Sequence, residues 1–135
     1  MGDVPAVEGI GHLSLTVTDV DRSVEWYGRV LGLSKMMDES HEGGYAIVMA
    51  TPDFRLLIGL HHHDANEGES FAETTTGLDH VGFNVPSRTD LEAWVARLDE
   101  LGVEHGEIEE QPYGALVTFR DPDNIQLEMI SLGGS

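Results

Sequence analysis

The sequence predicts an α+β fold built from two copies of one strand–helix–three-strand module. The first observation is an internal repeat, because residues 9–33 and 77–103 carry a glycine, a histidine, a valine, a tryptophan and a Leu-Gly pair at matching places. The second is that each copy opens with alternating apolar and polar residues and continues with apolar residues at helical spacing. The third is size, since 135 residues with 40% hydrophobic content suit a single domain, which we expect to span residues 1–135.

The first module is expected at about residues 8–61. Its opening strand, residues 10–17, places two sets of side chains on opposite faces: Leu13, Leu15 and Val17 on one, and His12, Ser14 and Thr16 on the other. Asp19 is a suitable N-cap for the helix that follows. Gly32 stands where that helix should end.

The second module is expected at about residues 77–131. Its first strand, residues 78–85, repeats the alternation, with His80 on the polar face. Ser87, followed by Asp90 three residues later, resembles a capping box at the start of the second helix. The buried stripe of that helix is predicted from its spacing: Leu91, Trp94, Val95, Leu98 and Leu101.

Three short strands should complete each module. Their expected ranges are roughly 34–40, 44–50 and 54–61 in the first module, and 103–109, 114–120 and 124–131 in the second. A polar linker at about residues 62–76 joins the modules and is expected to be exposed, at least in its middle.

Charge and composition exclude several classes of function. Twenty-five acidic residues against seven basic ones give a formal net charge of −18, which repels nucleic acid and anionic membranes. Such a surface suits solubility, and it would also attract a cationic small molecule. The chain has no cysteine, so disulfides and thiolate metal sites are excluded. Without a visible export signal or a membrane-length apolar run, we expect a cytoplasmic location.

The polar faces of the strands carry the residues with chemical potential. His12 and His80 occupy the same place in the two repeats, and the parity of the last strand puts Glu128 on the corresponding face. Two imidazoles and one carboxylate are a ligand set for one divalent metal ion, of which Fe, Mn, Ni, Co and Zn all fit. A single strand histidine is more often structural, so the argument depends on the repeat.

Further residues are assigned to the site by the same parity. His61 follows the apolar positions of its strand on the opposite face and is a candidate fourth ligand, whereas His62 and His63 are not expected to bind. The histidine run could instead be an exposed loop that collects metal adventitiously. Orienting roles are expected from Ser14, Asn84 and Gln126, and the candidates for a general base are Tyr45, Tyr113 and His61.

A family resemblance rests on these residues. The pattern extends from about residue 8 to 131 and comprises His12, Trp26-Tyr27, Leu31-Gly32-Leu33, His80, and the run FRDPDNIQLE with Glu128 at its end. This pattern resembles the vicinal oxygen chelate superfamily, which includes glyoxalases, bleomycin resistance proteins and extradiol dioxygenases. The resemblance implies paired βαβββ modules that form an open, barrel-like mixed sheet with the helices outside. It also implies metal ligands at His12, His80 and Glu128, and a symmetric homodimer whose sites are often built across two chains.

The departures from the family patterns separate the candidate activities. Glyoxalase I typically has a glutamate ligand on the last strand of the first module, where this chain reads LLIGLHHH. Extradiol dioxygenases use two histidines and one glutamate, which this chain supplies, but they usually have four modules. Bleomycin resistance proteins generally lack the metal ligands and are often acidic, as this chain is.

Three hypotheses follow. The first is a divalent-metal-dependent enzyme, a glyoxalase-like lyase or isomerase acting on a small substrate with vicinal oxygens. The second is an Fe(II) or Mn(II) ring-cleaving dioxygenase, and the third is a non-catalytic antibiotic-binding resistance protein. In each the partner is a small molecule. A homodimer is also expected because a half-barrel leaves open sheet edges.

Overall fold

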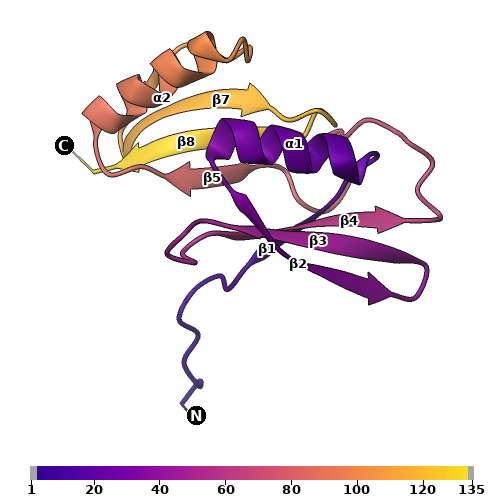
Figure 1. Cartoon of the computed structure of the whole chain (residues 1–135). Coiled ribbons are helices and arrows are strands. Elements are labelled where there is room, and N and C mark those ends of the chain that lie inside the picture. The colour runs from indigo at the N-terminus through magenta and orange to yellow at the C-terminus, as the bar shows by residue number, and fades with distance from the viewer. Residues whose placement is uncertain (1–2, 134–135) are drawn as a thin grey trace. The chain divides into compact units, whose positions relative to one another are not determined.

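A computed structural model describes residues 3–133 and shows the two βαβββ modules that the repeat predicted (Figure 1). The chain folds as two compact units, Met1–Asn66 and Glu67–Ser135, and each contains one four-stranded sheet and one helix. The α+β fold class is therefore confirmed. None of the helices in the described range 3–133 has the length and apolar character needed to span a bilayer.

The first unit is a four-stranded mixed sheet with one helix. Its elements are β1 (Leu13–Thr16), α1 (Val20–Leu31), β2 (Ser34–His41), β3 (Gly44–Ala50) and β4 (Leu57–His63). The strands lie in the order β1-β4-β3-β2, with β1 parallel to β4 and the other neighbours antiparallel.

Helix α1 begins and ends where the sequence indicated. The Asp19 side chain accepts a hydrogen bond from the backbone N–H of Arg22, as an N-cap does. Gly32 ends the helix with φ 73°, a left-handed conformation that costs glycine little. The buried face of α1 contacts β2, β3 and β4 and consists of Val20, Ser23, Trp26, Tyr27 and Val30.

The second unit repeats this design. Its elements are β5 (Val81–Asn84), α2 (Arg88–Glu100), β6 (Glu109–Gln111), β7 (Gly114–Arg120) and β8 (Gln126–Leu132). The order is β5-β8-β7-β6, with β5 parallel to β8. Leu91 and Leu98 of α2 are fully buried, and the helix contacts β7 and β8.

The Ser87–Asp90 contact differs from a capping box. Ser87 caps the helix as predicted, with its Oγ accepting from the Asp90 N–H at 3.2 Å. The Asp90 carboxylate does not reach back to the Ser87 N–H; it accepts the Ser87 hydroxyl at 2.6 Å. The aspartate is one methylene shorter than the usual glutamate, so the hydroxyl is the donor within its reach.

Several predicted strands are shorter than expected, among them β1 and β5, which cover only four residues each of the predicted ranges 10–17 and 78–85. Within 103–109 only Glu109 belongs to β6, and His105 makes an isolated bridge to Phe119. The imidazole of His105 forms hydrogen bonds with Asp99 and with the Gly106 carbonyl, and residues 103–108 do not form a regular edge strand. Strand β4 starts at Leu57 rather than 54 because Thr51 and Asp53 close a turn, and it continues through His63.

The turn before β8 fixes the last strand. Oδ1 of the buried Asp121 accepts from the N–H groups of Asp123 (2.8 Å) and Ile125 (2.9 Å), and Asn124 adopts φ 71°. The Asn124 side chain also donates to the carbonyl of Phe71. This network holds the start of β8, and with it the register of Glu128 two residues further along.

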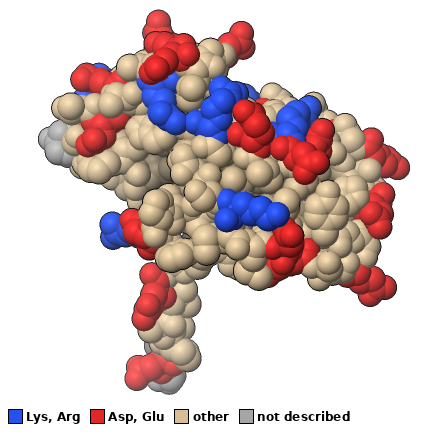
Figure 2. Space-filling view, viewed as in Figure 1, with Lys and Arg blue, Asp and Glu red and all other residues tan. Residues whose placement is uncertain are grey.

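Each sheet has one face covered by its own helix and one face that carries polar side chains. In the first unit Ile58 and Leu60 are fully buried on the helix side, and in the second Leu127 is. The alternation of β4 and β8 turns His61 and Glu128 to the other face. Acidic side chains are spread over the face shown in Figure 2, in line with the net charge of −18.

Candidate metal centre

Glu128 and His80 form the core of the candidate site in the second unit. Glu128 lies on β8 and is only 9% exposed, and its Oε1 is 3.7 Å from Nε2 of His80, which directly precedes β5. Gly82 is directly opposite Glu128 in the parallel pair. A Cβ at position 82 would stand 3.1 Å from Oε1, so the glycine makes room for the carboxylate.

Asp79 orients the imidazole of His80. Nδ1 of His80 donates to Oδ1 of Asp79 at 2.7 Å, which leaves Nε2 facing Glu128. The Asp79 hydrogen bond raises the pKa of His80, and the negative charge of Glu128 adds to this effect. A histidine held by a carboxylate at one nitrogen and open at the other is the usual arrangement of a metal-binding imidazole.

The residues around Glu128 shape the same face of the second sheet. Thr118 of β7 is directly opposite Glu128. Gln126, expected to orient ligands, accepts from Arg120 at 3.2 Å, and Arg120 also pairs with Glu73. A cavity of about 280 Å³ lies beside these residues, towards His105, and neither Glu128 nor His80 is among its lining residues: Glu104, His105, Gly106, Thr118, Phe119, Arg120 and Gln126. Asn84, the other expected orienting residue of this unit, is exposed and opposite Ile130.

The first unit shows what replaces the missing fourth ligand, a glutamate in glyoxalase I. Ser14 of β1 is opposite Gly59 of β4, just as Gly82 of β5 is opposite Glu128 of β8. Gly59 therefore holds the position equivalent to Glu128. His12 directly precedes β1 and is exposed.

His61 fills the space above Gly59. Its Nε2 is 3.3 Å from the place a Cβ at 59 would take, and Oγ of Ser14 is 2.8 Å from the same point. Burial lowers the pKa of His61, and the neighbouring His41 and His63 lower it further. The imidazole is therefore neutral at pH 7, with a lone pair available to a proton or a metal.

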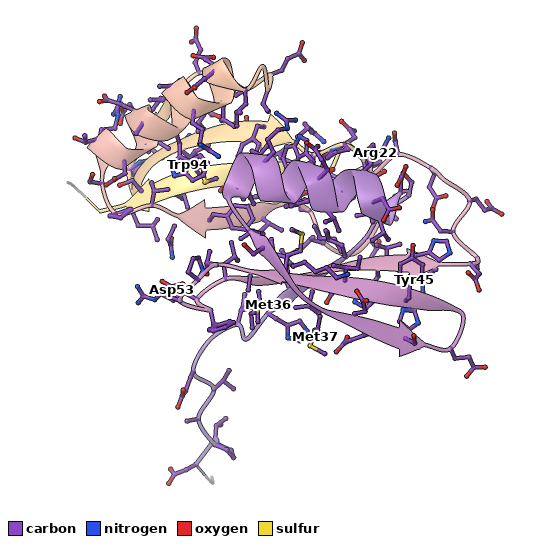
Figure 3. All side chains as sticks on the ribbon, in the orientation of Figure 1. Arg22, Met36, Met37, Tyr45, Asp53 and Trp94 are labelled. Atoms are coloured by element: carbon purple, nitrogen blue, oxygen red, sulfur yellow. The ribbon has the colours of Figure 1, made fainter. Side chains whose placement is uncertain are left out.

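The two tyrosine candidates lie elsewhere. Tyr45 of β3 (Figure 3) is opposite His62 and stacks on its ring at 5.2 Å, so it shares the face of His62 and not that of His61. Tyr113 lies in the turn between β6 and β7 and is 52% exposed.

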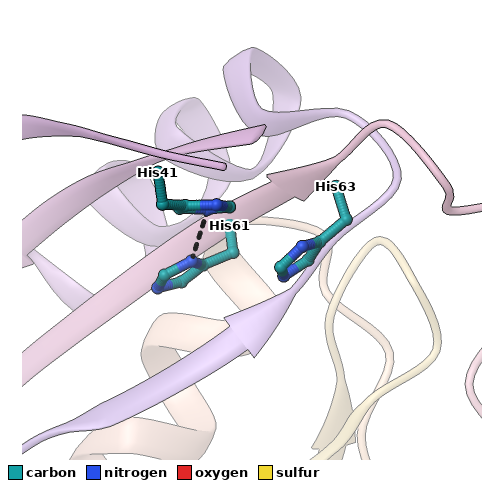
Figure 4. A group of neighbouring side chains, drawn as sticks. All are labelled: His41, His61 and His63. Atoms are coloured by element: carbon teal, nitrogen blue, oxygen red, sulfur yellow. Dashed lines mark hydrogen bonds between the residues drawn. The ribbon is translucent and has the colours of Figure 1, made fainter. Parts of the chain in front are cut away.

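Sequence reasoning missed two histidines that join His61. His63 was set aside, although it is two residues from His61 and so shares its face, and His41 at the end of β2 was not considered. The rings of the three form one group (Figure 4), with a hydrogen bond of 3.3 Å between Nδ1 of His61 and Nε2 of His41. Alternation in β4 could have found His63, whereas His41 required the strand pairing.

Comparison with known proteins supplies the family. Residues 9–129 match the family model of the Glyoxalase/Bleomycin resistance protein/Dioxygenase superfamily. The chain belongs to this superfamily. The match spans both modules, from the segment before β1 to Met129, the residue after Glu128 in β8.

Individual members of the superfamily show how far the likeness extends. A glyoxylase/bleomycin resistance protein/dioxygenase domain from Frankia sp. EAN1pec is 35% identical, with 96% of each chain covered and a TM-score of 0.86. The fosfomycin resistance protein FosX from Listeria monocytogenes, in complex with Mn(II) and sulfate, shares the fold at 20% identity, with 96% and 95% covered and a TM-score of 0.65.

A curated relative is longer than this chain. The putative ring-cleaving dioxygenase MhqA from Bacillus subtilis (strain 168) is 24% identical over 126 residues, which are 93% of this chain. The chain spans only about two fifths of that protein, since 40% of its length is covered.

Proposed function

We propose that this chain is a divalent-metal-dependent enzyme whose metal is bound by His12, His80 and Glu128. The observation that supports it is the pair of Glu128 and His80. A carboxylate that is only 9% exposed loses most of its hydration, and a bound cation would compensate for that loss. The Asp79 hydrogen bond already holds His80 as a ligand would be held.

This ligand set suits a substrate with two adjacent oxygens. A metal bound by two imidazoles and one carboxylate acts as a Lewis acid that stabilises negative charge on substrate oxygen. Three protein ligands leave up to three octahedral positions for the substrate and one further molecule. Ser14, Asn84 and Gln126 would orient the substrate, and the Arg120 contact would hold Gln126 in place.

The reaction we favour is that of a glyoxalase-like lyase or isomerase, which moves a proton between neighbouring carbons. Of the three base candidates, His61 is supported best, because its neutral imidazole shares a face with Ser14 and lies above Gly59. Tyr45 is on the opposite face of the sheet. His61 would accept the proton at an unprotonated ring nitrogen and return it to the product.

A ring-cleaving dioxygenase is the second candidate. Gly59 favours it, because a site without a fourth protein ligand leaves one more position open, enough for a bidentate catecholate and O2. The likeness to a putative ring-cleaving dioxygenase points in the same direction.

We also propose that the chain forms a homodimer. Strand β2 is an edge strand of its sheet and is exposed over almost its whole length. Two of its residues, Met36 and Met37 (Figure 3), are 47% and 50% exposed. Exposed apolar side chains on a sheet edge favour association, and light scattering would measure the mass.

The test is the metal content of tag-free protein purified without chelators, with His12→Ala and Glu128→Ala as variants. We expect one ion per chain at this site, lost in both variants. With Mn²⁺ or Fe²⁺ restored, O2 consumption with catechols would identify the dioxygenase. Turnover of thiol–ketoaldehyde adducts without O2 uptake would identify the lyase.

A negative result in the metal analysis would decide against the enzyme. If wild-type protein takes up no ion at this site even when divalent metals are added, the catalytic proposal is wrong. The acidic surface would then be tested against a cationic glycopeptide antibiotic by calorimetry, as for a non-catalytic binder.

A further inference from the structure

Three histidines converge on one face of the first sheet, away from its helix. His41, His61 and His63 each offer a ring nitrogen, and these atoms all lie within 4.8 Å of one another. The ring centroids are 5.3 Å apart for His41 and His61, 5.0 Å for His41 and His63, and 5.9 Å for His61 and His63 (Figure 4). Small side-chain rotations would bring three such nitrogens to bonding distance of one ion.

The strand pairing explains why the rings meet. His61 and His63 are two residues apart on β4 and therefore share a face. Gly44 of β3 pairs with His63 on one side and with His41 on the other. A Cβ at Gly44 would clash with the backbone carbonyl of His62 and would stand 2.7 Å from Cε1 of His41, so the backbone requires glycine here and the glycine also leaves room for the His41 ring.

A second small residue supports the third ring. Ala46 is opposite His61 and is fully buried. Glu39 of β2 is opposite Ala46 in the same cross-strand row, and its negative charge acts on His61. A negative charge beside the group favours a bound cation.

A hydrogen bond to a backbone carbonyl gives His41 a tautomer suited to metal binding. Nδ1 of His41 is 3.1 Å from the Glu42 carbonyl, which can only accept, so Nδ1 carries the proton. Nε2 of His41 then accepts from Nδ1 of His61. A backbone carbonyl holding the far nitrogen of an imidazole is a common support of a metal ligand.

We propose that His41, His61 and His63 form a second metal site for a divalent ion of the zinc, nickel or copper type. These ions prefer imidazole nitrogen, and three imidazoles leave an exposed fourth position for water or a ligand. The ion would replace the His41–His61 hydrogen bond, with the proton of His61 moving from Nδ1 to Nε2 so that the two facing nitrogens both present lone pairs. None of the three residues is among the ligands proposed for the first metal.

One residue is shared with the proposed reaction. His61 is both a ligand here and the base candidate of the lyase, and its lone pair cannot serve both roles at once. The test therefore changes His41 and His63 and leaves His61 intact.

The experiment is a Zn²⁺ titration of tag-free protein by calorimetry, with elemental analysis after gel filtration. We expect two ions per chain in the wild type, one in Glu128→Ala, and one in the double variant His41→Gln/His63→Gln. The matched control is His62→Gln, which should keep both ions. His62 belongs to the same run but faces the other way, with its ring on Tyr45 and its Nε2 2.9 Å from Asp64.

A second readout locates the ion. In the Glu128→Ala background, Zn²⁺ should shift the imidazole ¹⁵N resonances of His41 and His63 and leave those of His62 in place. Circular dichroism would check that each variant is folded.

Each outcome separates this site from the first. If Glu128→Ala binds no zinc, or the double variant binds as much as the wild type, the second site does not exist. If His62→Gln loses as much zinc as the double variant, the histidine run binds only adventitiously. If Glu128→Ala keeps the wild-type count while the double variant loses all zinc, this site stands and the first proposal fails.

Discussion

Replacement of Asp79 by alanine tests the orientation of His80. The variant removes the carboxylate that accepts from His80 Nδ1 at 2.7 Å and leaves the proposed ligands His80 and Glu128 in place. Loss of such a partner typically weakens metal binding by about 10- to 100-fold, or about 1.4–2.7 kcal/mol. Because the Asp79 side chain is 67% exposed, water screens its charge, and we expect the lower end, about tenfold.

The loss should depend on pH in a definite direction. Asp79 raises the pKa of His80, so wild-type His80 keeps its proton to a higher pH than the variant does. Above that raised pKa both proteins present a neutral imidazole, and the full loss of affinity is seen. As the pH falls, the metal must displace a more tightly held proton in the wild type, so the difference between the two proteins shrinks.

The assay is Mn²⁺ binding by calorimetry at pH 8 and pH 6. Asp64→Ala is the matched control, because Asp64 makes a similar contact of 2.9 Å to His62, which has no proposed role in the first site. Equal affinity of Asp79→Ala and wild type at pH 8, or an equal loss in Asp64→Ala, would refute the reasoning.

Three further predictions concern packing and charge. Gly82→Ala places a Cβ 3.1 Å from Oε1 of Glu128, so Mn²⁺ affinity should fall roughly tenfold in a folded protein; unchanged affinity in calorimetry would contradict this. The hydrogen bond to the Gly106 carbonyl and, after it, the one to Asp99 raise the pKa of His105. Protonated His105 therefore stabilises the fold fully at pH values below the ordinary pKa of histidine, and this stabilisation is lost as the pH rises through the raised pKa. Urea unfolding should therefore show His105→Gln less stable than wild type at pH 5.5, by about 0.2–1 kcal/mol, and equal to it near pH 9. Ser23 is fully buried on α1 and its hydroxyl has no hydrogen-bond partner among residues 3–133, so Ser23→Ala should raise the free energy of unfolding by about 1 kcal/mol; a lower thermal midpoint would count against it.

Local sequence signals were sufficient for the modules. Apolar spacing in α1, the Asp19 cap and the left-handed Gly32 all act within a few residues, so a reader of the sequence can place the helix. The repeat then predicts that the second module follows the same order of elements, as it does. The prediction of strand 103–109 was wrong because the side chain of His105 bonds Asp99 and the Gly106 carbonyl instead of continuing a ladder.

Alternation along a strand determined which face each polar residue takes. The period of two is a property of the extended backbone itself, so Glu128 and His61 could be assigned to the face opposite Leu127 and Leu60 from the sequence alone. The same rule assigns His63 to the face of His61.

Only the tertiary structure decided which residues meet across a sheet. Gly82 stands opposite Glu128, and Gly59 takes the equivalent position in the first unit. His41 joins two histidines of β4 across the gap that Gly44 leaves. These neighbours depend on register, and register is set jointly by turns and packing that involve residues far apart in the chain. Periodicity assigns a residue to a face, but it does not select the residue's partners.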